Sequence, residues 1–507
     1  MVKGLIKENV KEFFILYCSS GFMSMETPKY LGVVSHPAIG IRIPEVFLEG
    51  ILSAFKRANT AGGLMLSFGR ETAPEYVINS PPGKYEITMG HTGTSIRQYL
   101  TLGAEKAKEE GVLVEMEADH LTVTTSSARA VKRISGIKEV IEVKEEDVKK
   151  AFEYIKSEVE EAVSTGYVNF FTLDTCELID YSVDKASEEE VERRFYETYG
   201  RKGDNILDRY TNRRYVFIGS SGRSFRISMP KTRVMRLALK YGKSLEAIVK
   251  LYEMLKEMVS WDFGIEVALD EMPDITRPDE LLFYLRELWE MRVPVDYVAP
   301  NVGFEKKQDY RGDLQILRDR VERLSAVAKA FGAILSFHSG SGSDPYSGKG
   351  PGIYELLREA TGDSIKYKVS GIYYELLMYI LASYPKETPQ RELYEEIYDS
   401  VIEYLNREVE SQGPLDSPVL RKQLKEYHER IMKGGDRYDP KADIFRYYSF
   451  IALNLRDKEG RRRFREKIVN IYESDEDFKR IVDREVEGLT LRLIDGLGFF
   501  GNIEKIS

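Results

Sequence analysis

Cysteine, long apolar runs and excess positive charge are all scarce in this 507-residue sequence, and each shortage argues against a class of protein. The two cysteines, Cys18 and Cys176, are far apart and form no CxxC pair, which argues against a disulfide framework and favours a reducing cytoplasm. No apolar run approaches the roughly 18 residues of a membrane span. The segment Phe13 to Cys18 is shorter than the apolar core of a signal peptide, which needs about 7 residues or more. We therefore expect a soluble, cytoplasmic protein without a membrane partner.

Charge is abundant but balanced. Acidic residues outnumber basic ones, 83 to 74, so the composition does not predict a basic face for nucleic acid. Charged residues make up 31% of the chain, mostly Lys, Arg and Glu, which resembles the surface composition of thermophilic proteins.

Histidine is also rare, with five in the chain, which makes the position of each informative. His338 ends the apolar run Ala333–Phe337 and is followed by a loop of Ser, Gly and Asp residues. In α/β enzymes, ligands and bases stand at such strand ends. The alternative is a strand end whose imidazole only bonds a backbone carbonyl. His36 and His91 are weaker candidates on early loops, and His428 is expected at the surface.

Strand-like and helix-like segments alternate along the chain as far as residue 385. Expected helices include Pro44–Asn59, Asp147–Ser164, Leu245–Val259 and Leu314–Phe331. The expected strands are near Gly32–Ser35 and at Leu64–Phe68, Val112–Ala118, Tyr167–Leu173, Gly264–Leu269, Val295–Ala299, Ala333–Phe337 and Ile365–Val369. Eight such units are the number in a TIM barrel. We predict an α/β fold, a TIM (β/α)8 barrel with loop insertions and a C-terminal helical region.

Two insertions and a tail extend this barrel, which we place at residues 1–385. Residues 121–146 and 182–235 lengthen the loops after the third and fourth strands, and both are expected over the C-terminal mouth. The second insertion contains a predicted hairpin, Arg214–Ile218 with Ser224–Ser228. Residues 386–507 are predicted to form a helical region packed on the barrel.

Alternation within the expected strands turns acidic and basic side chains toward the barrel axis. In the fifth strand Val267 and Leu269 share the apolar face, so Glu266 and Asp270 point inward. The same reasoning turns the following residues inward: Glu115, Glu117, Asp119, Thr172, Asp174, Ser336, His338, Lys366 and Lys368.

The polar side chains therefore meet at one barrel mouth. The group comprises Asp119, His120, Asp174, Glu266, Asp270, His338 and Lys368. Two imidazoles with carboxylates suit a divalent transition metal such as Zn, Mn, Ni or Co. The alternative is a structural network of ion pairs, for example Lys368 with Asp270. Lys368 and Arg311 are expected to hold an anionic or polyhydroxylated end of a small substrate; a phosphate near Gly350-Pro351-Gly352 is the other possibility.

Six short motifs resemble those of the tagaturonate/fructuronate epimerase family in order and spacing. They are Glu117-Ala118-Asp119-His120, Phe171-Thr172-Leu173-Asp174, Glu266-Val267-Ala268-Leu269-Asp270-Glu271, Asp309-Tyr310-Arg311-Gly312-Asp313, His338-Ser339-Gly340-Ser341 and Lys368-Val369-Ser370-Gly371. The resemblance implies a metal-dependent barrel that interconverts keto-hexuronates, or in some members fructose and tagatose. It also implies a sugar or sugar-acid substrate as the partner, and it leaves the oligomeric state open.

The resemblance also suggests residue roles. His120, Glu266 and His338 are similar to the family's metal ligands, and Asp119, Asp174 and Asp270 to its acid/base positions. We add Lys368 to the catalytic group and Ser339, Asp344 and Arg311 to the substrate-binding group.

The sequence departs from the family around the substrate. After His338 the loop is longer, its lysine is displaced to a position such as Lys349, and Leu178 stands where the family tends to have a histidine. A different sugar substrate, a related aldolase or isomerase activity, or a non-catalytic carbohydrate-binding barrel are therefore alternatives. For an epimerase of this family we predict retro-aldol chemistry, because the C4 hydroxyl of a keto-hexuronate is β to its C2 ketone.

Overall fold

A closed barrel of eight parallel strands forms the centre of the computed structural model, which describes residues 27–124, 126 and 144–506. Around the barrel the strands run in the order β1, β10, β9, β8, β7, β4, β3 and β2. Their bounds are β1 His36–Gly40, β2 Gly62–Ser67, β3 Val114–Thr122, β4 Phe170–Asp174, β7 Gly264–Leu269, β8 Tyr297–Pro300, β9 Ile334–Phe337 and β10 Ile365–Val369. The predicted TIM barrel is confirmed.

The first strand lies later in the chain than the predicted position near Gly32–Ser35. It begins at His36, whereas residues 32–35 form an irregular segment in which Gly32 has a φ of 81°. The Tyr297 hydroxyl donates to the Gly32 and Val34 carbonyls there. His36 starts a strand although it is polar, because its side chain enters a charged barrel interior. It was predicted to lie on a loop, and that prediction was wrong.

Helices surround the barrel and bury the outward faces of the strands. They are α2 Pro44–Arg57, α3 Glu75–Ile78, α4 Ile96–Glu110, α6 Glu145–Ser164, α9 Lys231–Met258, α10 Pro278–Glu290, α11 Leu314–Lys329, α12 Ile353–Thr361 and α13 Gly371–Ser383. Helix starts follow local chemistry: the Ser95 side chain accepts from the Gln98 N–H, and Asp313 caps α11. Helix α9 begins much earlier than predicted.

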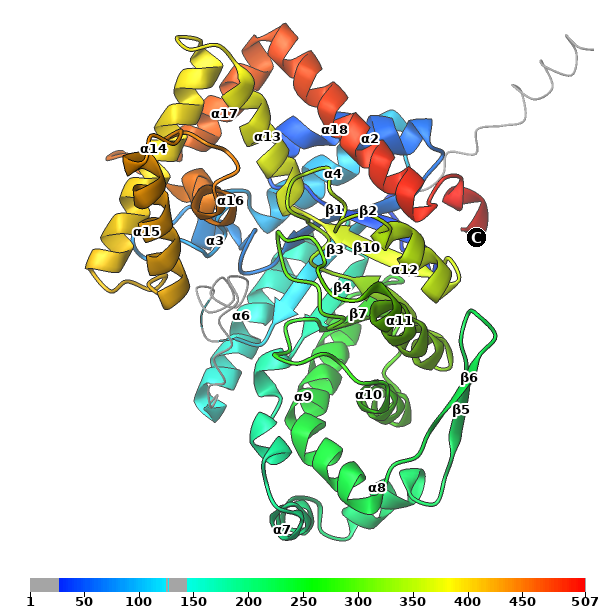
Figure 1. The fold of residues 1–507 in the computed structure, drawn as a ribbon. Helices are drawn as coiled ribbons and strands as arrows, with labels where there is room; N and C mark the ends of the chain where they lie inside the picture. Colours follow the sequence, from blue (N-terminus) through cyan, green and yellow to red (C-terminus); the bar gives the residue numbers. More distant parts are fainter. Residues whose placement is uncertain (1–26, 125, 127–143, 507) are drawn as a thin grey trace, which may run out of the picture.

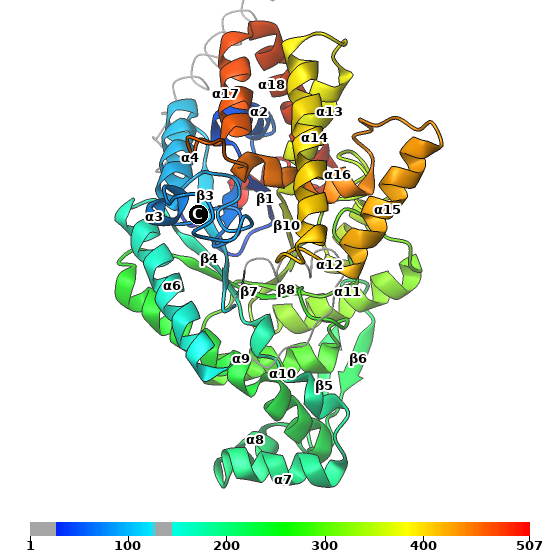
Figure 2. The ribbon, with the colours of Figure 1, turned by 90° about the vertical axis from the view of Figure 1, so that its left-hand side faces the viewer.

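The second insertion does not cover the mouth, so that prediction was wrong. It forms α7 Glu188–Tyr199, α8 Lys202–Tyr210 and the predicted hairpin, β5 Tyr215–Ile218 with β6 Ser224–Ile227. Tyr210 donates to Glu287 on α10, and Ser220 donates to the Glu359 carbonyl on α12. The insertion thus crosses the outside of the helical ring, as Figures 1 and 2 show. The first insertion lies largely outside the described residues, as does Cys18.

The C-terminal part of the chain is helical and packs on the barrel. It contains α14 Pro389–Glu410, α15 Pro418–Met432, α16 Asp443–Tyr448, α17 Arg463–Ser474 and α18 Glu476–Leu497. Helix α18 lies against α2, where Gly50 faces Asp483 and Val486. Beyond α18, the Asn502 side chain bonds the Ala61 N–H and C=O at the amino-terminal end of the barrel.

The C-terminal region also reaches the opposite end of the barrel. Arg446 on α16 is buried and donates to Glu375, to the Lys307 carbonyl and to the Gly342 carbonyl. Because Lys307 and Gly342 lie on the loops after β8 and β9, this one guanidinium joins both loops to α13. The C-terminal helices therefore help to fix the mouth.

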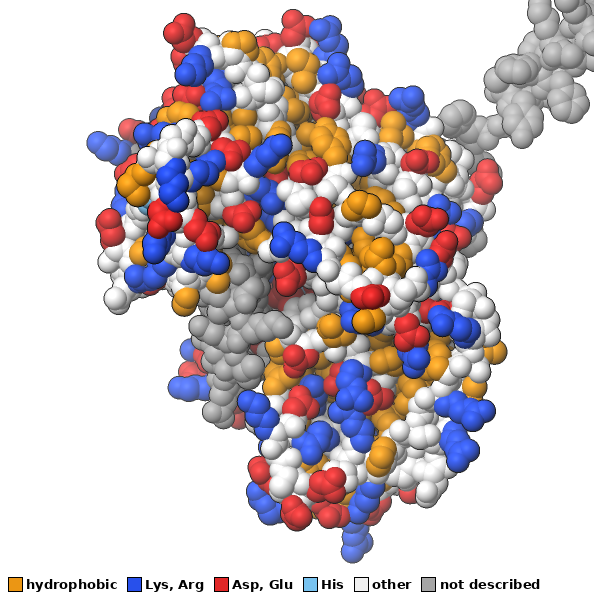
Figure 3. All heavy atoms as spheres, in the orientation of Figure 1, with side chains coloured by type: hydrophobic (Ala, Val, Ile, Leu, Met, Phe, Trp, Pro, Cys, Tyr) orange, Lys and Arg blue, Asp and Glu red, His pale blue; other side chains and the backbone are white. Residues whose placement is uncertain are grey.

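The outer surface carries mixed charge. In Figure 3 acidic and basic side chains are interspersed over the visible face and are not gathered by sign. Within the described residues, no helix combines the length and the apolar character needed to cross a membrane.

Candidate active site

A bulge at the end of β3 directs two neighbouring side chains into the barrel mouth. The pairing of β3 with β4 shifts register between Ala118 and Leu121, and His120 takes a φ of 53°. In a regular strand, Asp119 and His120 would point to opposite faces. A bulge with a left-handed residue re-aims the chain, and such backbone strain clusters at functional sites. Asp119 and His120 can therefore share one site.

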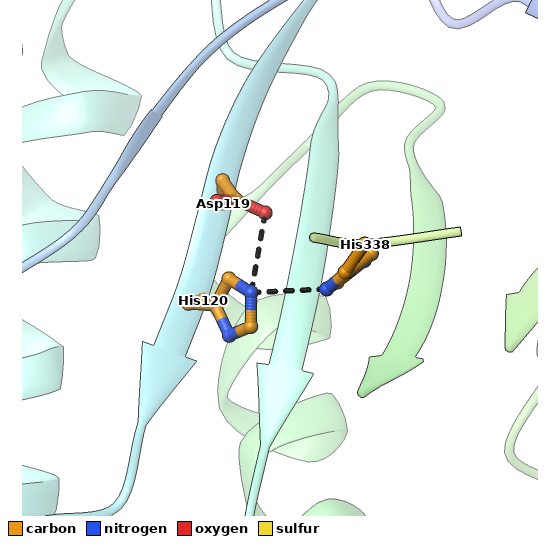
Figure 4. A group of neighbouring side chains, drawn as sticks. All are labelled: Asp119, His120 and His338. Atoms are coloured by element: carbon orange, nitrogen blue, oxygen red, sulfur yellow. Dashed lines mark hydrogen bonds and ion pairs between the residues drawn. The ribbon is translucent and has the colours of Figure 1, made fainter. Parts of the chain in front are cut away.

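Asp119, His120 and His338 form the centre of the site (Figure 4). The His120 Nε2 atom lies 3.1 Å from His338 Nδ1 and 3.9 Å from Asp119 Oδ1. All three side chains are buried, and their ligand atoms lie within 4.8 Å of one another. His120, Asp174 and Glu271 form a second group that meets the same limit. Each of these groups offers three ligand atoms close enough together to hold a metal ion.

The second nitrogen of each histidine faces a carboxylate. Asp174 Oδ2 lies 3.3 Å from His120 Nδ1, and Glu266 Oε1 lies 2.5 Å from His338 Nε2. Carboxylates in this position fix the orientation and the tautomer of a metal-binding imidazole. Asp270 Oδ1 lies 3.2 Å from His338 Nδ1. Burial favours a neutral imidazole, but Asp270 and Glu266 outweigh it and raise the pKa of His338 to about 9.

Lys368 binds the carboxylates from β10. Its Nζ lies 2.7 Å from Asp119 Oδ1 and 2.9 Å from Glu266 Oε1, and it donates to Thr172. Asp119 is further held by the Ser67 hydroxyl at 2.7 Å. Burial alone would raise the pKa of Asp119, but Lys368 and then His120 hold that pKa well below its usual range. The ion pair of Lys368 with Asp270 that was weighed from the sequence is replaced by pairs with Asp119 and Glu266.

A second charged layer lies beneath the first. Lys366 Nζ is 2.9 Å from Glu117 and 3.6 Å from Glu115, all fully buried with His36. Gly63 makes room for this layer, because a Cβ there would lie 1.7 Å from Glu117 Oε1. Burial raises the pKa of Glu115, although Lys366 opposes this shift.

The charge in the barrel is unbalanced. Six acidic side chains line this part of the barrel besides Glu271: Glu115, Glu117, Asp119, Asp174, Glu266 and Asp270. They face Lys366 and Lys368, and Arg70 and Lys306 face Glu271 at the same mouth, so acidic side chains outnumber Lys and Arg side chains seven to four. Buried charge is stable only when it is paired or binds a metal. A divalent cation in place of the His338 proton would reduce the excess, so the residues present fit such an ion.

Three predicted substrate-binding residues lie around this centre at different depths. Ser339 directly follows His338 with a φ of 57°. Asp344 accepts from the Tyr346 N–H within its own loop, and Arg311 is exposed. Lys349, the displaced lysine, is buried and donates to the Glu305 and Gln308 carbonyls. Ser339 is therefore next to one of the two histidines in the chain, whereas Asp344 and Lys349 bond to other loop residues.

Sequence reasoning gave no role to two cations that the structure places at the mouth. Arg70, after β2, donates to Glu271 Oε1 at 2.8 Å, and Lys306, after β8, donates to the same oxygen at 3.3 Å. Burial opposes the charge of Arg70, but Glu271 and then Asp174 outweigh it and raise its pKa. Glu271 could have been suspected because it directly follows Asp270 at the end of a strand. Arg70 follows a glycine and belongs to no motif, so the sequence did not indicate a role for it.

Known proteins match this chain both in sequence and in structure. A sequence profile of the tagaturonate epimerase family matches residues 145–488. The crystal structure of fructuronate-tagaturonate epimerase UxaE from Cohnella laeviribosi superposes with a TM-score of 0.63 at 20% identity, covering 93% of this chain and 83% of that chain. Its complex with two glycerol molecules gives the same values. A fructose-bisphosphate aldolase from Campylobacter jejuni has a TM-score of 0.38 at 12% identity over 93% of this chain and 92% of that chain. The search of curated proteins returned no match.

The barrel and the family match together define an isomerase, and within that class a sugar-acid epimerase. Since the profile spans well over half of the sequence, the chain belongs to the tagaturonate epimerase family. The resemblance inferred from short motifs is thereby confirmed.

Proposed function

We propose that the protein is a metal-dependent epimerase that inverts C4 of a keto-hexuronate by retro-aldol cleavage and re-addition. The observation that carries the proposal is the facing pair His120 and His338 with Asp119, inside a barrel with excess negative charge. Membership of the family supports a sugar-acid substrate.

The metal would be held by His120 Nε2, His338 Nδ1 and Asp119. Asp174 and Glu266 would then serve as the outer carboxylates that orient the two imidazoles, since each lies at the other ring nitrogen. This changes the sequence-based hypothesis for Glu266 from ligand to orienting residue and gives Asp119 the ligand position. A bound Zn, Mn, Ni or Co ion supplies Lewis-acid polarisation of the ketone.

The position of the reacting carbon dictates the chemistry. Fructuronate and tagaturonate differ at C4, whose hydrogen is not α to the C2 ketone, so enolisation cannot exchange it. Removal of the C4 hydroxyl proton instead lets the C3–C4 bond break, and the bonding electrons pass to the C2 oxygen as an enediolate. Rotation of the aldehyde fragment and re-formation of the bond return the proton with C4 inverted. Lys368 keeps its positive charge beside Asp119 and Glu266 during both the cleavage and the re-formation of the bond.

Asp270 is the best-placed proton acceptor among the three predicted acid/base residues. Asp119 is bound by Lys368 and Ser67, and Asp174 by His120 and the Cys176 N–H. Asp270 Oδ1 faces only His338 Nδ1, at 3.2 Å, and this side chain is partly exposed. A metal ion bound through His338 Nδ1 would end this ion pair and leave the Asp270 carboxylate available for the hydroxyl proton. Arg446 joins the loops around the mouth, which favours retention of the aldehyde fragment.

Turnover of tagaturonate in deuterated water tests the bond that breaks. We expect epimerised product with no deuterium at C4. Stoichiometric deuterium at C4 would contradict retro-aldol cleavage, and release of two three-carbon fragments would make the protein an aldolase.

Two variants test the proton acceptor. Asp270→Asn should keep its metal and lose at least ~100-fold in kcat, the usual size of an acid/base contribution. Asp174→Asn should instead lower metal affinity about 10–100-fold, the usual effect of an outer carboxylate. If Asp174→Asn keeps full metal affinity and loses turnover while Asp270→Asn is active, Asp174 is the acceptor.

A further inference from the structure

Two cations from different loops converge on one carboxylate oxygen beside the metal-binding residues. Arg70 Nη1 and Lys306 Nζ lie 2.8 Å and 3.3 Å from Glu271 Oε1. Two positive charges therefore share one carboxylate. The neighbouring Arg42 differs, because it pairs with Glu71 at 2.6 Å and also donates to the Ser370 hydroxyl.

Arg70 keeps an unused donor in a buried place. The residue is only 8% exposed, and its Nε atom has no hydrogen-bond partner among the described residues. A buried guanidinium donor without a partner is energetically unfavourable, so it marks a place where an acceptor belongs. Guanidinium groups match carboxylates in shape and charge.

Glu271 connects the two cations with the histidine end of the site. Glu271 presents a ligand atom within 4.8 Å of those of His120 and Asp174, so the cation pair lies just beyond the metal-binding group. In an extended hexuronate, C2 is separated from the carboxylate carbon by four C–C bonds, or roughly 5 Å. One molecule can thus reach both places.

We propose that Arg70, assisted by Lys306, binds the substrate carboxylate and selects sugar acids over neutral sugars. This inference rests on the proposed function and assigns the anionic grip to residues other than Arg311 and Lys368. Arg311 is exposed, and Lys368 is engaged deep in the barrel by Asp119 and Glu266. Arg70 and Lys306 are specificity-determining residues, and the metal-binding group handles the ketone end.

The test compares tagaturonate with tagatose, which carries a hydroxymethyl group in place of the carboxylate. Apparent Kd values for both sugars are measured by calorimetry on the full-length, metal-loaded protein and on Arg70→Met, Arg70→Lys and Lys306→Met. Arg193→Met, on exposed α7, is the matched control. Metal content is measured on every variant, and Lys306→Met guards against misfolding because its side chain is 24% exposed.

We expect Arg70→Met to weaken tagaturonate binding by ~30-fold, as for loss of a charge-assisted hydrogen bond. Lys306→Met should weaken it less, Arg70→Lys should recover part of the loss, and tagatose binding should change by less than ~3-fold. Equal weakening of both sugars, unchanged tagaturonate binding in both Met variants, or no preference of the wild type for tagaturonate would overturn the inference. Tagaturonate selected through Arg70 but never epimerised would instead refute the proposed function and leave the carboxylate grip intact.

Discussion

His120 Nε2 and His338 Nδ1 face each other at 3.1 Å across the mouth of the barrel, although their residues are 218 positions apart in the chain. Each ring is held from behind by a carboxylate, Asp174 for His120 and Glu266 for His338. Carboxylates in this position fix the orientation of each imidazole, as the proposed metal site requires.

Removal of one imidazole should therefore remove the metal. His338→Ala is expected to lose most of its bound divalent ion, measured by elemental analysis after dialysis, and to lose turnover with it. His428→Ala is the control, since His428 is exposed on α15. Full metal occupancy and normal activity in His338→Ala would refute the assignment.

Loss of the Lys368 charge should destabilise the barrel as well as inactivate it. Lys368→Met leaves Asp119 and Glu266 buried without their closest cation, and breaking a buried pair costs about 3–5 kcal/mol of unfolding free energy. Urea denaturation measures this loss. Lys467→Met, which breaks an exposed pair with Glu396, should change the midpoint little. Equal midpoints for the two variants would contradict the role of Lys368.

Stability and activity should both depend on the absence of a side chain at Gly63. Gly63→Ala would push Glu117 away from Lys366, and we expect a loss of about 1–3 kcal/mol with reduced activity. Gly488→Ala is the matched control, because a Cβ on this position of α18 meets nothing within 4 Å. Alanine there should be neutral or stabilise the helix by up to about 1 kcal/mol. A Gly63→Ala protein as stable and active as wild type would show that the lower layer tolerates displacement.

Lys349 should make stability depend on pH. Burial lowers the pKa of Lys349 to about 7, from an ordinary value of 10.5. Between these two values the unfolded chain binds a proton that the folded protein lacks, so the free energy of unfolding rises with pH, by up to about 1.4 kcal/mol per pH unit. Below about pH 7 this contribution is constant. Denaturation of wild type and Lys349→Met from pH 6.5 to 9.5 checks it: the variant should lose this slope, and an unchanged slope would contradict the assignment.

Local sequence determined most of the barrel and much of the site. Period-two alternation placed Glu266 and Asp270 inward because Val267 and Leu269 must face the helices, and the same rule correctly placed Lys366 and Lys368. Strands with such regular burial can be recognised from the sequence, because every second residue must be apolar to pack against the helices. The expected strand Ile365–Val369 agrees with β10 at both ends.

Only the tertiary structure decided the features that break this regularity. The bulge that brings Asp119 and His120 to one face depends on how β3 pairs with β4, and the polar first strand at His36 depends on the acidic layer it enters. Likewise, the meeting of Arg70 with Lys306 on Glu271 joins three loops distant in sequence. Within the regular strands, the sequence by itself determined which residues face the barrel axis, because that follows from local periodicity. The contacts among these side chains were decided by the closure of the barrel. Contacts between loops depend on the packing of the whole fold, which local periodicity does not describe.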